Sequence, residues 1–237
     1  MVTRKSKAEI ARMRQAGRVV AEVLQLVEDA LKPGVSTGHL DRLAEAHIRK
    51  SGAVPSFKGY PGVNPRRPFP ASLCISIDDE IVHGIPGERT IREGQIVSID
   101  AGAIVDGWHG DAARTFYVGE PPAAVAALID TTREAMDAGI EAAVAGRHIE
   151  DISAAVEDVA APRGYGIIRQ FVGHGIGTEM HEEPQVPNYR TGRKGRKLEP
   201  GLCLAIEPML TLGDYRAHLL EDDWTVATVD GSLAAHF

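Results

Sequence analysis

Cysteine is scarce in this 237-residue sequence: Cys74 and Cys203 are the only two, so a disulfide framework is excluded. Long apolar runs are missing as well. No stretch approaches about 18 uncharged apolar residues, so a membrane-spanning helix is not expected. Basic charge is in deficit, since 26 Lys and Arg against 33 Asp and Glu give a net charge of −7, which disfavours DNA as a partner. Residues 1–10 contain no apolar export segment, so we expect a cytoplasmic protein.

The residues that are present are typical of a globular chain that begins with two amphipathic helices. Apolar residues make up 43% of the sequence, which excludes disorder over its whole length. Ser6 and Glu9 form a capping box, and apolar residues then recur at spacings of three and four as far as Leu31. A second helix is predicted over about 36–51, a proline-rich loop over 53–70, and β-type runs at 73–77, 80–83, 95–105 and 108–118.

The same order of elements returns further along the chain. Helical patterns at 121–144 and 149–159 are followed by β-type runs at 166–172, 203–207 and 224–229, and Asp230-Gly231 predicts a hairpin after the last run. Residues 1–119 and 120–237 therefore share a pattern of two helices, strands and a hairpin. This predicts an α+β fold of two pseudo-symmetric halves, with an antiparallel sheet, flanking helices and a site at their interface.

A geometric argument singles out two aspartates. With Asp106-Gly107 as the two residues of a hairpin turn, Gly102 faces Asp111 and Asp100 faces Ala113. Asp100 and Asp111 then lie diagonally on one face of the hairpin, among apolar neighbours. Two buried carboxylates repel each other unless a cation or a shared proton lies between them. The alternative is a pair of solvated charges on an exposed strand.

The second half supplies groups that complement these carboxylates. His174 lies in the glycine-flanked sequence 173–177, and Glu207 ends the apolar run 203–207. A lone histidine is more often structural than a ligand, but two Asp, one Glu and one His together form an oxygen-rich ligand set. Such a set suits a pair of divalent first-row metals better than a structural zinc. His83 and His181 are candidates for hydrogen bonding or proton transfer beside the metals.

At this point the sequence resembles a known family, the type I methionine aminopeptidases, over nearly its whole length. The stretches that carry the resemblance are Gly59-Tyr60, Phe69–Ser76, Glu80–Pro86, Ser98–Asp100, Asp106–Asp111, Gly173–Gly177, His181–Pro184, Ile206–Pro208 and Trp224-Thr225. The resemblance implies the pita-bread fold in a single catalytic domain, 1–237. It also implies a metal-dependent hydrolase that removes the initiator methionine from nascent polypeptides with a small second residue.

The resemblance also implies a role for each site residue. Asp100 would chelate one metal, Asp111 and Glu207 would bind both, and His174 would bind the second. Of His83 and His181, one would contact the substrate near its scissile amide and the other would help stabilise the oxyanion. The pocket for the methionine side chain would be lined by Tyr60, Phe69, Cys74, Met180 and Trp224; Cys74 and Met180 also suit a purely structural core position. Two divalent ions are implied, and cobalt, manganese, iron and zinc all tolerate these ligands.

The sequence departs from the family pattern at several places. Val63–Pro68 lengthens a usually short link, Asp78 replaces an Asn beside a structural monovalent-cation site, and Met180 replaces an aromatic residue. A fifth ligand, a Glu, is expected directly after Phe237, so the sequence as written is expected to be truncated at its C-terminus. Two alternatives follow: a catalytically impaired homologue, or a hydrolase of the same fold that cleaves Xaa-Pro bonds or dipeptides. The basic loop 190–197 reads as a solvated loop, with proximity to the ribosome as the alternative, and a monomer is expected.

Overall fold

The computed structural model describes residues 2–237, and four α-helices and thirteen strands are found among them. The helices are α1 (Lys7–Ala30), α2 (Thr37–Lys50), α3 (Ala123–Ala142) and α4 (Ile149–Ala160). The strands of the first half are β1 (Val54–Pro55), β2 (Leu73–Ile77), β3 (Glu80–Val82), β4 (Ile96–Val105) and β5 (Trp108–Tyr117). Those of the second half are β6 (Gly166–Ile167), β7 (Gly173–Gly175), β8 (Glu182–Val186), β9 (Leu204–Ala205), β10 (Met209–Thr211), β11 (Ala217–Leu219), β12 (Val226–Thr228) and β13 (Ala234–His236).

The first helix shows how local sequence sets an element. The Ser6 hydroxyl accepts from the Glu9 amide at 3.3 Å, and the Glu9 carboxylate accepts from the Ser6 amide at 2.7 Å, which confirms the predicted capping box. The helix ends at Ala30, three residues before Pro33. Its buried apolar face includes Val20, Val23 and Val27 and packs against β4 and β5. Burial of this face, rather than helix propensity alone, holds the helix in place.

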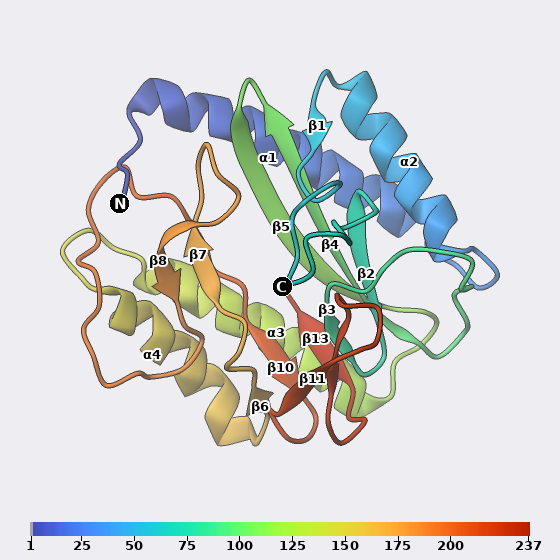
Figure 1. Ribbon diagram of the computed structural model, residues 1–237. Helices are drawn as coiled ribbons and strands as arrows, with labels where there is room; N and C mark the ends of the chain where they lie inside the picture. Colours follow the sequence, from blue (N-terminus) through green and yellow to red (C-terminus); the bar gives the residue numbers. More distant parts are fainter. Residues whose placement is uncertain (1) are drawn as a thin grey trace.

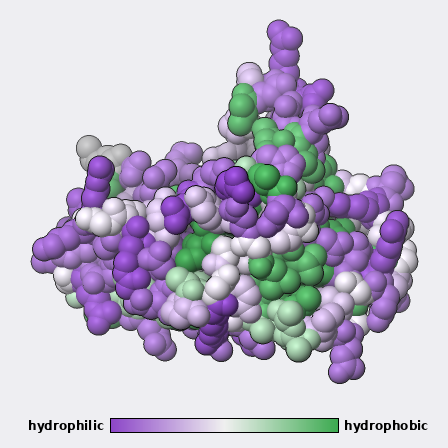
Figure 2. Space-filling model, turned by 90° about the horizontal axis from the view of Figure 1, so that it is seen from below, coloured by the Kyte–Doolittle hydropathy of each residue, from purple (hydrophilic) through white to green (hydrophobic). Residues whose placement is uncertain are grey.

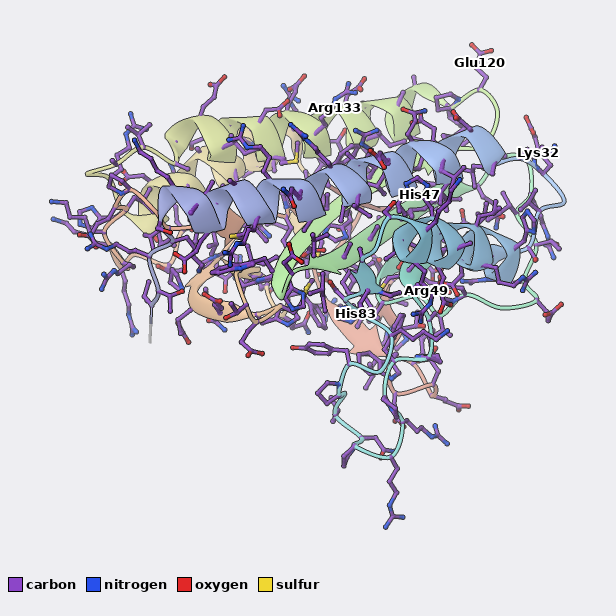
Figure 3. The ribbon with its side chains drawn as sticks, turned by 90° about the horizontal axis from the view of Figure 1, so that it is seen from above. Lys32, His47, Arg49, His83, Glu120 and Arg133 are labelled. Carbon is purple, nitrogen blue, oxygen red and sulfur yellow. The ribbon has the colours of Figure 1, made fainter. Side chains whose placement is uncertain are left out.

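All strand pairs are antiparallel and arranged in four small sheets among the described residues. The largest has the order β1-β4-β2, with β5 also paired to β4. The two halves are joined because β12 of the second half pairs with β3 of the first. Seen from above, α1 and α3 lie on one side of the strands, and His83 lies on the other (Figure 3). The helices thus cover one face and leave the opposite face of the strands for a site (Figure 1).

The long hairpin of the first half has the predicted register. Asp106 and Gly107 form the turn, Gly102 pairs with Asp111, and Asp100 pairs with Ala113. Both turn residues have positive φ, as a type I′ turn requires. The second predicted hairpin is wrong. Val229 and Asp230 do form a turn, but β12 pairs with β11 and β3, whereas β13 pairs with β10. The chain changes sheets at this turn, which no local pattern encodes.

The strands of the second half are shorter than predicted. The run 166–172 leaves the sheet after Ile167, and Gln170, Phe171 and Val172 line a cavity instead. Similarly, the run 203–207 contributes only Leu204 and Ala205 to a ladder. In both places the backbone leaves its hydrogen-bonded pairing just before a residue that faces the cavity.

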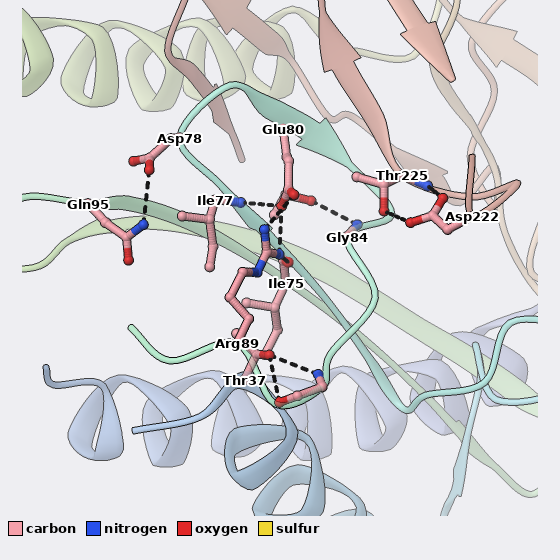
Figure 4. A network of polar contacts seen from close by, with 12 residues as sticks. Thr37, Ile75, Ile77, Asp78, Glu80, Gly84, Arg89, Gln95, Asp222 and Thr225 are labelled. Carbon is pink, nitrogen blue, oxygen red and sulfur yellow. Dashed lines mark hydrogen bonds and ion pairs between the residues drawn. The ribbon is translucent and has the colours of Figure 1, made fainter. Parts of the chain in front are cut away.

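A polar network supports the strands of the first half that lead to His83 (Figure 4). Arg89 donates two hydrogen bonds to the Glu80 carboxylate, at 2.6 and 2.8 Å, and the Ile77 amide donates to the same carboxylate at 2.8 Å. Such a bidentate pair is more rigid than a single contact. Asp222 accepts from the hydroxyl of Thr225, which follows Trp224 directly. Among residues 2–237 no helix has both the length and the apolar character needed to cross a membrane.

Candidate active site

One cavity of about 460 Å³ collects every residue that the sequence predicted for the site. It lies between the two halves and is lined by residues of both. The predicted residues among its lining are Tyr60, Phe69, Cys74, His83, Asp100, Asp111, His174, Met180, His181, Glu207 and Trp224. Residues separated by more than 160 positions in the chain therefore meet at one place, as a site at the interface of the halves requires.

The acidic end of the cavity is built from strands of both halves. Asp100 on β4 and Asp111 on β5 are diagonal neighbours across the hairpin, and both line the cavity. His174, in the middle of β7, places its Nε2 atom 3.8 Å from Asp111 Oδ2 and 3.3 Å from Glu207 Oε1. Glu207 follows β9 and is freed from the ladder by Pro208. The diagonal pair predicted from the hairpin register thus faces the His and Glu of the second half.

The carboxylates in this cluster lack compensating charge. Burial, with the charges of Asp111 and Glu207 added, raises the pKa of Asp100 well above its usual range. Burial also raises the pKa of Asp111 to about 7, with the Glu207 charge as a further cause, and the pKa of Glu207 to about 7. Two of their oxygens, Asp111 Oδ1 and Glu207 Oε1, are buried and accept no hydrogen bond. Orphaned acceptors of this kind are costly and call for a partner.

A divalent cation fits this donor set. The oxygens are hard ligands, and a positive ion between them would relieve the repulsion that raises their pKa values. As the side chains lie, no group of three or more among residues 2–237 is arranged to hold a metal ion. Two buried carboxylates that lie close together share a proton when no cation separates them. The cluster therefore fits a metal ion by the chemistry of its side chains, although these side chains do not form a complete coordination shell.

The hydrogen bonding of His174 fits the same interpretation. Its Nδ1 atom lies 2.8 Å from the carbonyl oxygen of Gly175, which can only accept, so Nδ1 carries the hydrogen and donates. In the tautomer with its hydrogen on Nδ1, the ring has its lone pair on Nε2, the atom that faces Asp111 and Glu207. Metal-binding histidines are typically oriented by a hydrogen bond of this kind from the other ring nitrogen.

Two further histidines lie beside the acidic cluster and are neutral near pH 7. Burial lowers the pKa of His83 to about 4, and burial together with the charges of His174, His83 and His109 lowers the pKa of His181 to about 4. The His181 ring packs edge-on against the His174 ring, with centroids 4.3 Å apart. The His181 Nδ1 atom lies 2.6 Å from the Tyr60 hydroxyl. His83 has positive φ, an uncommon conformation for a non-glycine residue that the surrounding structure must hold.

The other end of the cavity is apolar. Phe69, Cys74 and Met180 are buried in one cluster with Phe57, and Tyr60 and Trp224 pack against it. Burial raises the pKa of the Cys74 thiol well above its ordinary value, so the thiol stays protonated and acts as a small apolar group. The result is a soft, aromatic and sulfur-rich wall that faces the acidic cluster across one cavity.

The segment 63–68, expected from the sequence to be an insertion, stands at the rim of this apolar wall. It projects from the body of the molecule, with apolar residues gathered at its base (Figure 2). The Trp224 indole donates to the Arg67 carbonyl at 2.9 Å, and both Asn64 and Arg67 contact the Asp223 carboxylate at 3.2 Å. The segment is therefore bonded to the loop that carries a pocket residue, while Val63, its first residue, is 87% exposed.

The structure adds residues that sequence reasoning missed. His236 lines the cavity, its Nε2 atom is buried without a partner 3.6 Å from Glu207 Oε2, and burial lowers its pKa to about 4. Phe171 packs edge-on against His83 with ring centroids 5.5 Å apart. Neither residue belongs to a motif with a recognisable spacing. One sequence feature could have identified His236: it lies two residues before the position at which the fifth metal ligand was expected.

Comparison with known proteins shows the family. A family model, "Metallopeptidase family M24", matches residues 11–228. The methionine aminopeptidase of Clostridium acetobutylicum is 51% identical over 238 residues, covering 100% of this chain and 93% of its own length. The crystal structure of methionine aminopeptidase from Rickettsia prowazekii superposes with a TM-score of 0.95 at 36% identity, covering 100% of this chain and 94% of that one.

A more distant structure separates the fold from the family. The Xaa-Pro dipeptidase from Bacillus anthracis superposes with a TM-score of 0.77 at 24% identity, covering 99% of this chain and 57% of that one, and thus shares the fold alone. The predicted pita-bread fold and the predicted family are both confirmed. The chain belongs to metallopeptidase family M24 and, within it, to the methionine aminopeptidases.

Proposed function

We propose that this chain is a metal-dependent aminopeptidase that removes the N-terminal methionine from polypeptides whose second residue is small. One observation carries the proposal: a single cavity joins an uncompensated carboxylate and histidine cluster to an apolar, sulfur-rich wall. Its acidic end suits a free amine and metal ions, and its apolar end suits an unbranched thioether side chain. The full-length similarity to methionine aminopeptidases supports the same activity.

Asp100, Asp111, His174 and Glu207 would hold two divalent ions. Two observations support this ligand assignment. Asp111 Oδ1 and Glu207 Oε1 are buried without a hydrogen-bond partner, and the hydrogen of His174 on Nδ1 leaves the lone pair of Nε2 free. When bound, paired ions of this kind activate a water and polarise the scissile carbonyl. Iron, manganese, cobalt and zinc are the candidates, since all accept oxygen and imidazole ligands. We also propose that a structural monovalent cation binds near Asp78.

His83 and His181 would act on the substrate as neutral hydrogen-bonding groups. If the Tyr60 hydroxyl donates to His181 Nδ1, the hydrogen of His181 is on Nε2, which can then donate to an oxygen that gains charge during the reaction. His83 is wedged between Phe171 and Trp224, with ring centroids 5.5 and 6.2 Å away. These contacts restrict its rotation and keep its ring at the cavity. Each histidine would therefore be oriented before the substrate arrives.

Tyr60, Phe69, Cys74, Met180 and Trp224 would bind the methionine side chain. Phe69 and Trp224 meet edge-on with ring centroids 5.0 Å apart, an arrangement favoured for aromatic pairs. We further propose that residues 1–237 form a single catalytic domain and that the protein is a cytoplasmic monomer. Its partners would be the N-termini of nascent polypeptides, which it would meet near the ribosome.

Peptide turnover and metal content test the proposal together. Purified protein supplied with manganese or cobalt should hydrolyse Met-Ala-Ser and leave Xaa-Pro peptides intact. Cleavage of Xaa-Pro peptides in preference to Met-Ala-Ser would overturn the assigned specificity. Asp111→Ala and Glu207→Ala should each lose bound metal, measured by inductively coupled plasma mass spectrometry. Two metals per chain in either variant would overturn the assigned ligands.

A further inference from the structure

The turn that carries Met180 and His181 has no strand or helix of its own. Residues 176–181 connect β7 to β8, and their shape depends on side-chain hydrogen bonds. The Glu182 carboxylate accepts through Oε1 from the backbone amides of Thr178, at 3.0 Å, and Glu179, at 3.4 Å. One side chain therefore closes the turn that places two cavity residues.

The other oxygen of this carboxylate is held from the start of the chain. Glu182 Oε2 accepts from Lys5 Nζ at 2.6 Å and from the Thr3 hydroxyl at 2.7 Å. The side chains of Lys5 and Glu182 are only 4% and 9% exposed. The Lys5 amide also donates to the Gly201 carbonyl at 2.7 Å, so the segment that delivers the ammonium is itself fixed. A charge pair this far from water persists only when its hydrogen bonds are well formed.

The turn is clamped closely on both sides. A Cβ on Gly177 would overlap the ends of the Glu182 and Lys5 side chains, so a larger residue there would have to displace the ion pair. On its other side, the Gly177 carbonyl accepts from the His109 amide at 2.9 Å. His109 lies on β5, two residues before Asp111. The turn is thus fixed between the N-terminal segment and the strand that carries a proposed metal ligand.

We propose that Lys5 is a positioning residue for the reaction: through Glu182 it holds the 177–181 turn so that Met180 and His181 face the cavity. The inference rests on the proposed function and goes beyond it, because Lys5 itself does not line the cavity. A buried ion pair that only stabilised the fold could be exchanged for apolar side chains at little loss. A positioning pair could not, because the apolar side chains would leave the turn amides without an acceptor.

Hydrogen exchange tests the positioning directly and without reference to activity. In Lys5→Met, the amides of Thr178 and Glu179 should exchange faster than in the wild type, because Glu182 loses its charged partner and keeps only the Thr3 hydroxyl on Oε2. Lys7→Met is the matched control. Lys7 is exposed and lies two residues away, so this variant removes the same charge from a side chain that does not hold the turn. Unchanged protection of both amides in Lys5→Met would overturn the proposal.

Activity then separates positioning from stability. In folded Lys5→Met, kcat/KM for Met-Ala-Ser should fall by about tenfold or more, because a small misplacement of a reacting group has a large effect. Lys7→Met should match the wild type, and Lys5→Arg, which keeps the charge, should recover part of the loss. In a His181→Ala background the effect of Lys5→Met should shrink, since both changes act on the same turn. An undiminished effect in that background would overturn the inference.

A paired variant covers the case in which Lys5→Met does not fold. Lys5→Met combined with Glu182→Leu removes both charges and should fold, yet kcat/KM should remain as low as expected for the single variant. Wild-type kcat/KM in this folded double variant would show that the pair is only structural. These outcomes are distinct from failure of the proposed function, in which the wild type itself would not release methionine.

Discussion

Replacement of Glu207 by glutamine should stabilise the metal-free protein while it weakens metal binding. Burial raises the pKa of Glu207 from an ordinary value of 4.5 to about 7. The folded state therefore binds this proton more tightly than the unfolded state, and the wild type loses stability as the pH rises from 4.5 to 7. The pKa difference corresponds to about 3 kcal/mol at pH 8. Glutamine carries no charge, so Glu207→Gln escapes this loss.

Urea unfolding after treatment with EDTA measures the effect. At pH 8, Glu207→Gln should be more stable than the wild type by about 3 kcal/mol, equivalent to a rise in Tm of roughly 6–12 °C for a chain of this size. Below pH 4.5 the two proteins should have nearly the same free energy of unfolding, because the carboxyl is protonated in both states. Glu221→Gln, at an exposed position, is the control and should change little.

Metal addition should narrow the difference in stability. At a manganese concentration about 100 times its Kd, the wild type should gain about 2.7 kcal/mol, whereas Glu207→Gln should gain less at the same concentration. The reasoning would be refuted if metal-free Glu207→Gln were no more stable than the wild type at pH 8. The reasoning would also be refuted if the two proteins differed in free energy of unfolding by the same amount at pH 4 and pH 8, because the effect would then not arise from the charge of Glu207.

Two further predictions concern packing and protonation. Gly110→Ala should destabilise the fold by about 2–3 kcal/mol in urea unfolding, because its Cβ would lie 2.6 Å from the Gly17 backbone nitrogen in α1. Gly17→Ala, which meets no neighbour, should be neutral or slightly stabilising, and equal losses in both variants would contradict the packing argument. His83 and His181, whose pKa values lie at about 4, should show constant side-chain NMR shifts between pH 6 and 8 and titrate only in acid. Titration of either ring near pH 6.5 would contradict its burial.

Local rules explain why much of the first half could be predicted from sequence. The capping box at Ser6 and the Asp106-Gly107 turn involve residues within three positions of each other, so their geometry is set by short-range sterics and hydrogen bonds. From that turn, the period of two along each strand fixed the register that brings Asp100 and Asp111 together. The same turn signal at Asp230-Gly231 predicted the wrong pairing. There, the chain passes from β12 to β13 in a different sheet, and long-range pairing overrides the local preference.

The sequence by itself therefore determined the chemistry of the site: which carboxylates, imidazoles and apolar side chains were available, and which of them shared a face of the hairpin. It could not determine how the two halves meet. The pairing of β3 with β12 and the close approach of His174 to Glu207 join residues far apart in the chain. Such contacts form only when the apolar faces of both halves are buried together, so they depend on the whole fold. The whole fold also decides where His236 lies in the cavity and how Lys5 is linked to the turn that carries His181.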